Sequence, residues 1–380
     1  MKVPFLDLDA QSRRLGGALE AAVAEVLTSQ QFILGPAVER FEEAMARYCG
    51  VPWAVGVGSG TDALLLTLQA LGVGPGAVVV TTPFSFFATA SAVARLGGRV
   101  LFADVDPQTL NLDPRSVQAV LDHDVPGVVG LLPVHLFGRL APMADLAASA
   151  RGRGLWIVED AAQAVGARGD AGMAGTLGRA GCLSFYPTKN LGGIADGGMV
   201  LTADEGLARA LRRDRNQGMT GPYEHTSLGA CSRLDAVAAA ALHVKLRHLD
   251  AWNARRRAIA ARYASGFRDA GLAGGTGAPI VPPEAAGEAH VFHQYVVRAR
   301  TRDALAHHLA AEGVATQVYY RTPLHRQPAL ADHALVPAPL PHAERAAGEV
   351  LALPVHPELE DAQVDHVVRA CARFYDTAAR

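Results

Sequence analysis

Short apolar runs alternate with helical patterns through the first 200 residues, and this alternation limits the chain to few architectures. Helical patterns such as TDALLLTLQAL (61–71) and FFATASAVARL (86–96) lie between the runs. The apolar runs are WAVGV (53–57), AVVVTT (77–82), RVLFADV (99–105), VVGLLPVHLF (128–137), LWIVED (155–160), GCLSFY (181–186) and GMVLTA (198–203). Runs that are apolar on both faces are typical of parallel strands covered by helices on both sides. The sequence therefore predicts an α/β fold with a large, mostly parallel sheet.

The pattern changes after about residue 232. Two helices are expected to meet near Asp250, and the Gly- and Pro-rich stretch 271–290 predicts a loop. The remaining elements, typical of a smaller α+β domain, are the strand-like run QYVVRAR (294–300), a helix (301–311) and the strand-like run TQVYY (316–320). We expect a large α/β domain over residues 1–248, N-terminal helices included, and a small C-terminal α+β domain over residues 249–380.

Composition excludes several classes of protein. Of the 380 residues, 50% are hydrophobic and 19% charged, which favours a large buried core over disorder. A net charge of -2 gives no reason to expect binding to nucleic acid or to an anionic membrane. The four cysteines show no C-x-x-C spacing, so no metal site is predicted. With neither a long apolar run nor the pattern of a signal peptide, we expect a cytoplasmic protein without a membrane span.

Only three lysines occur in the chain: Lys2, Lys189 and Lys245. Lys189 follows a predicted strand and Pro187, and it precedes a glycine-rich turn. A lysine held in a cleft at the edge of a sheet can have a lowered pKa, which suits Schiff-base chemistry. Position alone leaves an ordinary solvated loop lysine as an equal alternative. Lys2 and Lys245 are expected to be solvent-exposed.

Two further segments supply what a Schiff-base lysine would need. Asp160 ends the predicted strand LWIVED, at the edge of the sheet where α/β proteins bind ligands. A carboxylate there can hold the protonated ring nitrogen of a pyridine cofactor, although a helix N-cap is the plainer alternative. The run VGSGTDALLL places Gly58, Ser59, Gly60 and Thr61 directly before a helix, where free backbone N–H groups favour a phosphate.

These motifs, taken in order, carry a family resemblance. The order GSGTDAL, PFSFFATA, VEDAAQAVGA, SFYPTKNLG and GACSRLDAVAAAAL resembles the DegT/DnrJ/EryC1/StrS family of sugar aminotransferases. The resemblance extends from FILGPAVERFE (32–42) to LALPVHP (351–357). It implies fold type I, the cofactor pyridoxal 5'-phosphate (PLP), and a homodimer with shared active sites.

The resemblance also implies a role for individual residues. Lys189 would bind the cofactor as a Schiff base and move the proton during catalysis, and Asp160 would pair with the pyridine nitrogen. The other implied cofactor contacts are Gly60, Thr61 and Ser184 at the phosphate, Gln163 at the ring oxygen and Phe86 on the ring face. Implied substrate contacts are Arg233, Tyr319 and His325.

Some of these residues have plainer alternatives. Phe86 and its neighbour Phe87 are alternatively core aromatics, and Ser184 a buried strand hydroxyl. His135, in PVHLFG, is expected to be structural or near the substrate. The family usually has asparagine where this chain has Cys231, and that asparagine contacts the phosphate across the dimer. A thiol is a poor substitute donor, which puts this contact in doubt.

The implied activity is transfer of an amino group from L-glutamate to a nucleotide-linked ketosugar. We expect a 3-keto-6-deoxyhexose on dTDP, with a C4-ketosugar or a cyclitol ketone as alternatives. Relatives that deoxygenate or dehydrate sugars generally replace the lysine, and Lys189 opposes that reading. A regulatory protein that keeps the fold without catalysis is the alternative from another class, and the intact Lys189, Asp160 and Gln163 argue against it.

Overall fold

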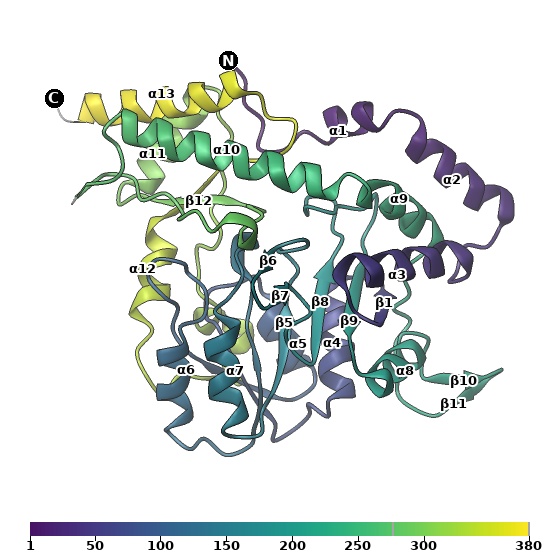
Figure 1. Cartoon of the computed structure of the whole chain (residues 1–380). Helices are drawn as coiled ribbons and strands as arrows, with labels where there is room; N and C mark the ends of the chain where they lie inside the picture. Colours follow the sequence, from purple (N-terminus) through teal and green to yellow (C-terminus); the bar gives the residue numbers. More distant parts are fainter. Residues whose placement is uncertain (276, 379–380) are drawn as a thin grey trace.

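An eight-stranded sheet forms the centre of the computed structural model, which describes residues 1–275 and 277–378 (Figure 1). The strands, in order across the sheet, are β1 (Trp53–Val57), β9 (Gly198–Thr202), β8 (Ala180–Ser184), β5 (Trp156–Asp160), β4 (Val128–Leu132), β2 (Val78–Thr81), β3 (Arg99–Phe102) and β13 (Ala334–Leu335). Strand β9 is antiparallel to both of its neighbours, and all other adjacent pairs are parallel. The predicted α/β fold with a mostly parallel sheet is confirmed.

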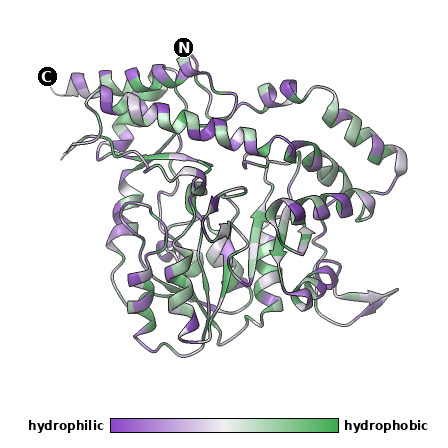
Figure 2. Cartoon of the chain, viewed as in Figure 1, coloured by the Kyte–Doolittle hydropathy of each residue, from purple (hydrophilic) through white to green (hydrophobic). Residues whose placement is uncertain are grey.

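Helices cover both faces of this sheet, as the apolar strands require. On β2, Val79 packs into one buried cluster while Val78 and Val80 pack into another, because successive side chains point to opposite faces. One face is covered by α4 (Gly60–Ala70), α5 (Ala88–Arg95) and α8 (Glu205–Asp214). The other is covered by α3 (Pro36–Cys49), α6 (Pro114–Leu121), α7 (Met143–Arg151) and α9 (Ala236–Leu246). Figure 2 shows the apolar strands between these helices.

The C-terminal part of the chain builds a second core at the top of Figure 1. A two-stranded antiparallel sheet packs there with three helices that run alongside it. These elements are α10 (Leu249–Asp269), β12 (Tyr295–Arg298), α11 (Arg302–Ala311), β14 (Val350–Leu353) and α13 (Asp361–Ala378). The two helices expected to meet near Asp250 are α9 and α10.

Each end of the chain also packs on the core built by the other. Val3 pairs with Val314 and is buried in the C-terminal core, whereas β13 adds to the edge of the central sheet. The 3-10 turns η3 (Leu324–Arg326) and η4 (Pro328–Leu330) also pack on the large sheet, through Leu324 and Leu330. The division at residue 248 stays a prediction.

Two predicted strands are shorter than expected. The run 128–137 ends as a regular strand at Leu132, because Pro133 has no N–H for the ladder. An isolated bridge between Val134 and Asp160 and the 3-10 turn η1 (Leu136–Gly138) follow. The run 316–320 forms only a single bridge, between Gln317 and Ala352.

The remaining elements lie around these two cores. Among the described residues, no helix is long and apolar enough to cross a membrane. The outlying elements are α1 (Leu8–Leu15), α2 (Ala18–Ser29), the pairs β6 (Arg168–Gly169) with β7 (Gly172–Met173) and β10 (Met219–Gly221) with β11 (Glu224–His225), η2 (Gly287–Ala289) and α12 (Pro341–Glu349).

Candidate active site

A cavity of about 470 Å³ opens at the carboxyl ends of β1, β8 and β5. Eight of the residues expected in the site line it together: Gly60, Thr61, Phe86, Asp160, Gln163, Ser184, Lys189 and Tyr319. Ligands of α/β proteins bind in this position, at the carboxyl ends of the strands. The structure therefore brings most of the predicted site together from segments that are far apart in the sequence.

The start of α4 forms one wall of the cavity. Ser59 caps the helix, and its hydroxyl accepts a hydrogen bond from the backbone N–H of Asp62 at 3.1 Å. A Cβ on Gly60 would lie only 2.7 Å from the Cβ of Ser184, so only glycine lets β8 approach the helix this closely. The first N–H groups of the helix are left without intrahelical partners, which suits an anionic group such as a phosphate.

Asp160 lies on the floor of the cavity and is 5% exposed. Its Oδ2 accepts a hydrogen bond from the Thr89 hydroxyl at 2.7 Å, and its Oδ1 accepts one from the Ala162 N–H at 3.2 Å. Burial raises the pKa of Asp160, whereas these two hydrogen bonds and the positive charge of Lys189 oppose the rise. No helix begins after Asp160, so the N-cap alternative is wrong. A cation in the cavity would stabilise the ionised carboxylate.

Lys189 lies on the turn after β8 and faces the same cavity. Burial lowers the pKa of its amine to about 8, although the charge of Asp160 opposes this shift. Among the described residues its Nζ has no hydrogen-bond partner. An amine with a pKa this low is partly neutral near pH 7, as a nucleophile must be.

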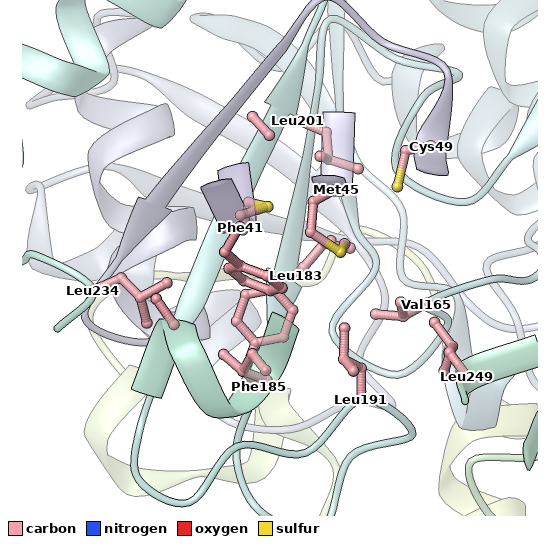
Figure 3. Close-up of a cluster of buried hydrophobic side chains, with 14 of the residues drawn as sticks. Phe41, Met45, Cys49, Val165, Leu183, Phe185, Leu191, Leu201, Leu234 and Leu249 are labelled. Carbon is pink, nitrogen blue, oxygen red and sulfur yellow. The ribbon is translucent and has the colours of Figure 1, made fainter. Parts of the chain in front are cut away.

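Buried side chains on both sides of Lys189 fix the turn that carries it. Phe185 and Leu191 belong to the apolar cluster shown in Figure 3. The ring of Phe185 packs edge-on against Phe41 of α3, with centroids 5.3 Å apart. Burying one such side chain is worth about 2 kcal/mol, so the turn has little freedom to leave the cavity.

Lys245 also holds this turn, and its expected exposure to solvent is wrong. It is 5% exposed, and its Nζ donates a hydrogen bond to the carbonyl of Gly192 at 2.8 Å. Lys245 lies on α9, whose alanine-rich faces are buried against α2 and α3. The helix therefore directs the lysine inward, where a backbone acceptor satisfies it. Lys2 is exposed, as expected.

Gln163 is oriented by its own hydrogen bonds. Its Oε1 accepts the backbone N–H of Phe137 at 2.6 Å, so its amide nitrogen faces the cavity. That nitrogen donates to the hydroxyl of Tyr320 at 3.0 Å. An amide has two N–H bonds, which leaves one for an oxygen in the cavity.

Aromatic side chains line the rest of the cavity. Phe86 is 58% exposed, so it is not a core aromatic, and Tyr186 is 52% exposed. Phe87 is 38% exposed, and it is absent from the part of the cavity lining that the structure describes. Tyr319 and Tyr320 close the cavity from the C-terminal part of the chain.

Two of the predicted substrate contacts lie outside the described lining of this cavity. Arg233 donates to the Oδ1 of Asn216 at 2.8 Å and to the sulfur of Cys231 at 2.9 Å. These two contacts hold its side chain outside the described lining of the cavity. The side chain of His325 packs edge-on against Phe102 and lies 3.2 Å from Glu344.

His135 is structural. Its Nδ1 accepts the backbone N–H of Ala141 at 3.0 Å, so its Nε2 carries the proton and donates to Glu159 at 2.7 Å. Both side chains are fully buried, and Glu159 also accepts three backbone N–H groups from the segment 175–178. The pair holds this segment against β5.

From the C-terminal part of the chain, the described lining includes three residues that were not singled out by the sequence: Tyr320, His293 and Gln294. His293 and Gln294 directly precede β12 in the run HQYVV, and Tyr320 follows Tyr319. The only signal was a cluster of polar and aromatic residues beside a predicted strand. Nothing in the spacing indicated that the C-terminal part would return to this cavity.

Comparison with known proteins decides the family. The sequence profile described as the DegT/DnrJ/EryC1/StrS aminotransferase family matches residues 14–372. The chain belongs to this family. Its members are PLP-dependent sugar aminotransferases, so the chain is an enzyme of that kind and the resemblance seen in the sequence is confirmed.

Individual DegT/DnrJ/EryC1/StrS proteins match over nearly the whole chain. A pleiotropic regulatory protein of Geobacillus stearothermophilus is 45% identical over 99% of both chains. The dTDP-3-amino-3,4,6-trideoxy-alpha-D-glucose transaminase of Streptomyces venezuelae is 43% identical over 97% of this chain and 95% of its own. The crystal structure of DesV from S. venezuelae, 43% identical, covers 98% of each chain with a TM-score of 0.92.

The cavity fits PLP, the cofactor of the family. A solved relative that is 29% identical contains the amine form of the cofactor, PMP. In this chain, Asp160 is a buried carboxylate that has no ion-pair partner among the described residues, and a protonated pyridine nitrogen would supply one. Lys189 is an amine of lowered pKa on the same cavity, and the start of α4 offers N–H groups for a phosphate. These three features match the ring nitrogen, the aldehyde and the phosphate of PLP.

Proposed function

We propose that this enzyme transfers the amino group of L-glutamate to a 3-keto-6-deoxyhexose carried on dTDP. The observation that carries the proposal is the position of Lys189 and Asp160 on one cavity, in a chain 43% identical to a transaminase named for a dTDP-3-amino sugar. The name of that relative supports dTDP and carbon 3. The amino donor is inferred from the family resemblance alone.

The proposal assigns a role to each residue of the cavity that would meet the cofactor. PLP, when bound, supplies an aldehyde that captures amines and a ring that withdraws electrons. Lys189 binds the cofactor and moves the proton at the α-carbon of the donor, and then at C3 of the sugar. Asp160 holds the ring nitrogen protonated, and the free N–H of Gln163 orients the ring oxygen. Phe86 covers one face of the ring, and the N–H groups at Gly60 and Thr61 hold the phosphate with help from Ser184.

An exposed aromatic side chain at the cavity supports a nucleotide-linked substrate. Tyr186, which has no role toward the cofactor in this proposal, leaves more than half of its surface uncovered beside the cavity. An exposed aromatic ring is a stacking platform for a base, worth about 1–3 kcal/mol. The nucleotide would then supply binding energy away from the reacting carbon.

A homodimer is part of the proposal. Hydrophobic side chains are exposed on the loop after α2 and around the β10–β11 hairpin, which projects from the body of the molecule (Figure 1). They are Phe32, Ile33, Tyr223 and Leu228, and the last two are 93% exposed. Such residues on one chain indicate a surface that another copy covers. Analytical ultracentrifugation should give the mass of a dimer, and a monomer at micromolar concentration would contradict this part.

Product analysis tests the sugar specificity. The purified enzyme, loaded with PLP, is mixed with glutamate and with dTDP-3-keto-6-deoxyglucose, dTDP-4-keto-6-deoxyglucose or a cyclitol ketone. Amination at C3 of the first sugar is expected. Amination only at C4, or only of the cyclitol, would overturn the proposal and favour the corresponding alternative.

The same assay tests the alternative of a regulatory protein without catalysis, which the name of the Geobacillus relative brings up. The intact Lys189 and Asp160 oppose that alternative. A protein that binds PLP yet aminates none of the ketones would support it.

A further inference from the structure

His293 is the buried histidine of the cavity. It lies just before β12, where the chain enters the C-terminal core, and it is 5% exposed. Its side chain lines the same cavity as Lys189 and Gln163. None of the cofactor contacts proposed above involves it, so its presence needs another reason.

Asn190 determines which nitrogen of His293 carries the proton. The amide nitrogen of Asn190 donates to the Oδ1 of Asn253 at 2.7 Å and to the carbonyl of Val291 at 3.1 Å. Both of its N–H bonds are therefore used, and its Oδ1 can only accept. Because that oxygen lies 3.2 Å from the Nδ1 of His293, Nδ1 carries the hydrogen and donates.

The other ring nitrogen of His293, Nε2, is then a hydrogen-bond acceptor with only one weak donor nearby. Its contact is the amide nitrogen of Gln294 at 3.4 Å, close to the upper limit for a hydrogen bond. Burial, together with the positive charges of Lys189 and Arg256, lowers the pKa of His293 well below its usual range. The imidazole is therefore neutral at physiological pH, and its Nε2 lone pair stays available.

We propose that His293 is a substrate-binding residue whose Nε2 accepts a hydrogen bond from a hydroxyl group of the sugar, next to the carbon that receives the amine. This inference rests on the proposed function and deepens it. A lone pair attracts a hydroxyl and repels both carboxylates of glutamate, whose amino group is the one consumed in the reaction, so His293 acts on the sugar. Asn190, adjacent to Lys189, positions the imidazole ring through its hydrogen bond with Nδ1.

Separate measurement of the two half-reactions tests this role. The cofactor spectrum follows the first half when the PLP form of the enzyme is mixed with glutamate alone. It follows the second half when the PMP form, freed of glutamate, is mixed with dTDP-3-keto-6-deoxyglucose. His293→Phe keeps a planar ring but removes the acceptor. We expect the sugar half to slow by roughly 10- to 100-fold while the glutamate half changes by less than about threefold. His307→Phe, at an exposed histidine of α11, is the matched control and should change neither.

Deoxy analogues identify the hydroxyl and exclude a merely structural role. The wild type should discriminate against the 2-deoxy or the 4-deoxy analogue of the ketosugar, and His293→Phe should lose that discrimination for the same analogue. His293→Gln, which restores an acceptor oxygen, should recover part of it. If the phenylalanine variant fails to fold, His293→Met serves instead, because methionine fills irregular space without a strong acceptor.

Each result either supports the inference or overturns it. Equal slowing of both half-reactions, no slowing, or undiminished discrimination in His293→Phe overturns the role of His293 and leaves the proposed function standing. Failure of the wild type to aminate any nucleotide-linked ketosugar overturns the proposed function, and this inference with it.

Discussion

The hydroxyl of Thr89, on α5, donates a hydrogen bond to the Oδ2 of Asp160, at the end of β5, across 2.7 Å. This contact, the N–H of Ala162 and the positive charge of Lys189 all stabilise the buried carboxylate as an anion. Asp160→Asn removes the charge and keeps the shape. We expect kcat to fall by roughly 10²- to 10³-fold, since a protonated ring nitrogen would lose its counter-charge. Thr89→Val should cost only about tenfold, and equal losses would contradict the role of the charge.

Gly60 should be intolerant of a side chain. A Cβ at this position would lie 2.7 Å from Ser184, so Gly60→Ala must push α4 away from β8 and widen the phosphate site. We expect the Kd for PLP, measured by equilibrium dialysis, to rise at least about tenfold, with a loss of about 1–3 kcal/mol in stability. Gly17→Ala, at the start of α2 where nothing lies within 4 Å, should change neither quantity.

Three parts of the site could be predicted from local signals in the sequence, whereas Gln163, Phe86, Ser184 and Tyr319 were implied only by the family resemblance. Asp160 ends an apolar run, Gly60 and Thr61 precede a helix, and Lys189 follows a strand and a proline. These signals place residues at the carboxyl edge of a sheet, and there the structure finds them. The order of the strands was not predictable in this way, because it depends on contacts between distant segments.

Long-range packing determines where the side chains of Lys245 and His325 lie. Lys245 looked like a surface residue because charge on a helix usually faces water, yet α9 is buried along most of its length, packed against α2 and α3. His325 is a substrate contact that the family resemblance implies, and that role stays a prediction. It faces Glu344 because the backbone N–H of Leu324 donates to the carbonyl of Pro83, which fixes the 3-10 turn.

Capture of PLP by the enzyme without cofactor should depend on pH through Lys189. Only the neutral amine attacks the aldehyde, and the pKa of Lys189 is lowered to about 8. At pH 7 about 10% of the amine is then neutral, against ~0.03% for an ordinary lysine. Stopped-flow measurement should show the capture rate rising with pH to a plateau, with a midpoint near 8. A midpoint above 10 would refute the environment we describe.

The charge of Asp160 gives this pH profile a matched test. Its attraction for the ammonium of Lys189 opposes the lowering of the pKa. Asp160→Asn should therefore move the midpoint of PLP capture to lower pH, and a move to higher pH would contradict the assigned cause.

Lys245 should matter for catalysis although it lies outside the described lining of the cavity. Lys245→Met removes the donor to the Gly192 carbonyl and leaves that buried oxygen unsatisfied. We expect a loss of about 1–3 kcal/mol in unfolding free energy and roughly a tenfold lower kcat. The reason is that the turn carrying Lys189 loses the hydrogen bond that fixes it to α9. Lys2→Met, at the exposed N-terminus, is the control and should match the wild type in both measurements.

The central claim is that Lys189 is the residue that binds PLP, and reduction followed by peptide mapping tests it most directly. Borohydride links the cofactor permanently to the amine that holds it, and mass spectrometry of the digest locates that amine among the three lysines of the chain. The account predicts the added mass on Lys189 alone, and its absence from Lys189→Ala. Labelling of Lys245 or Lys2, or a wild type that acquires no label after incubation with PLP, would contradict it.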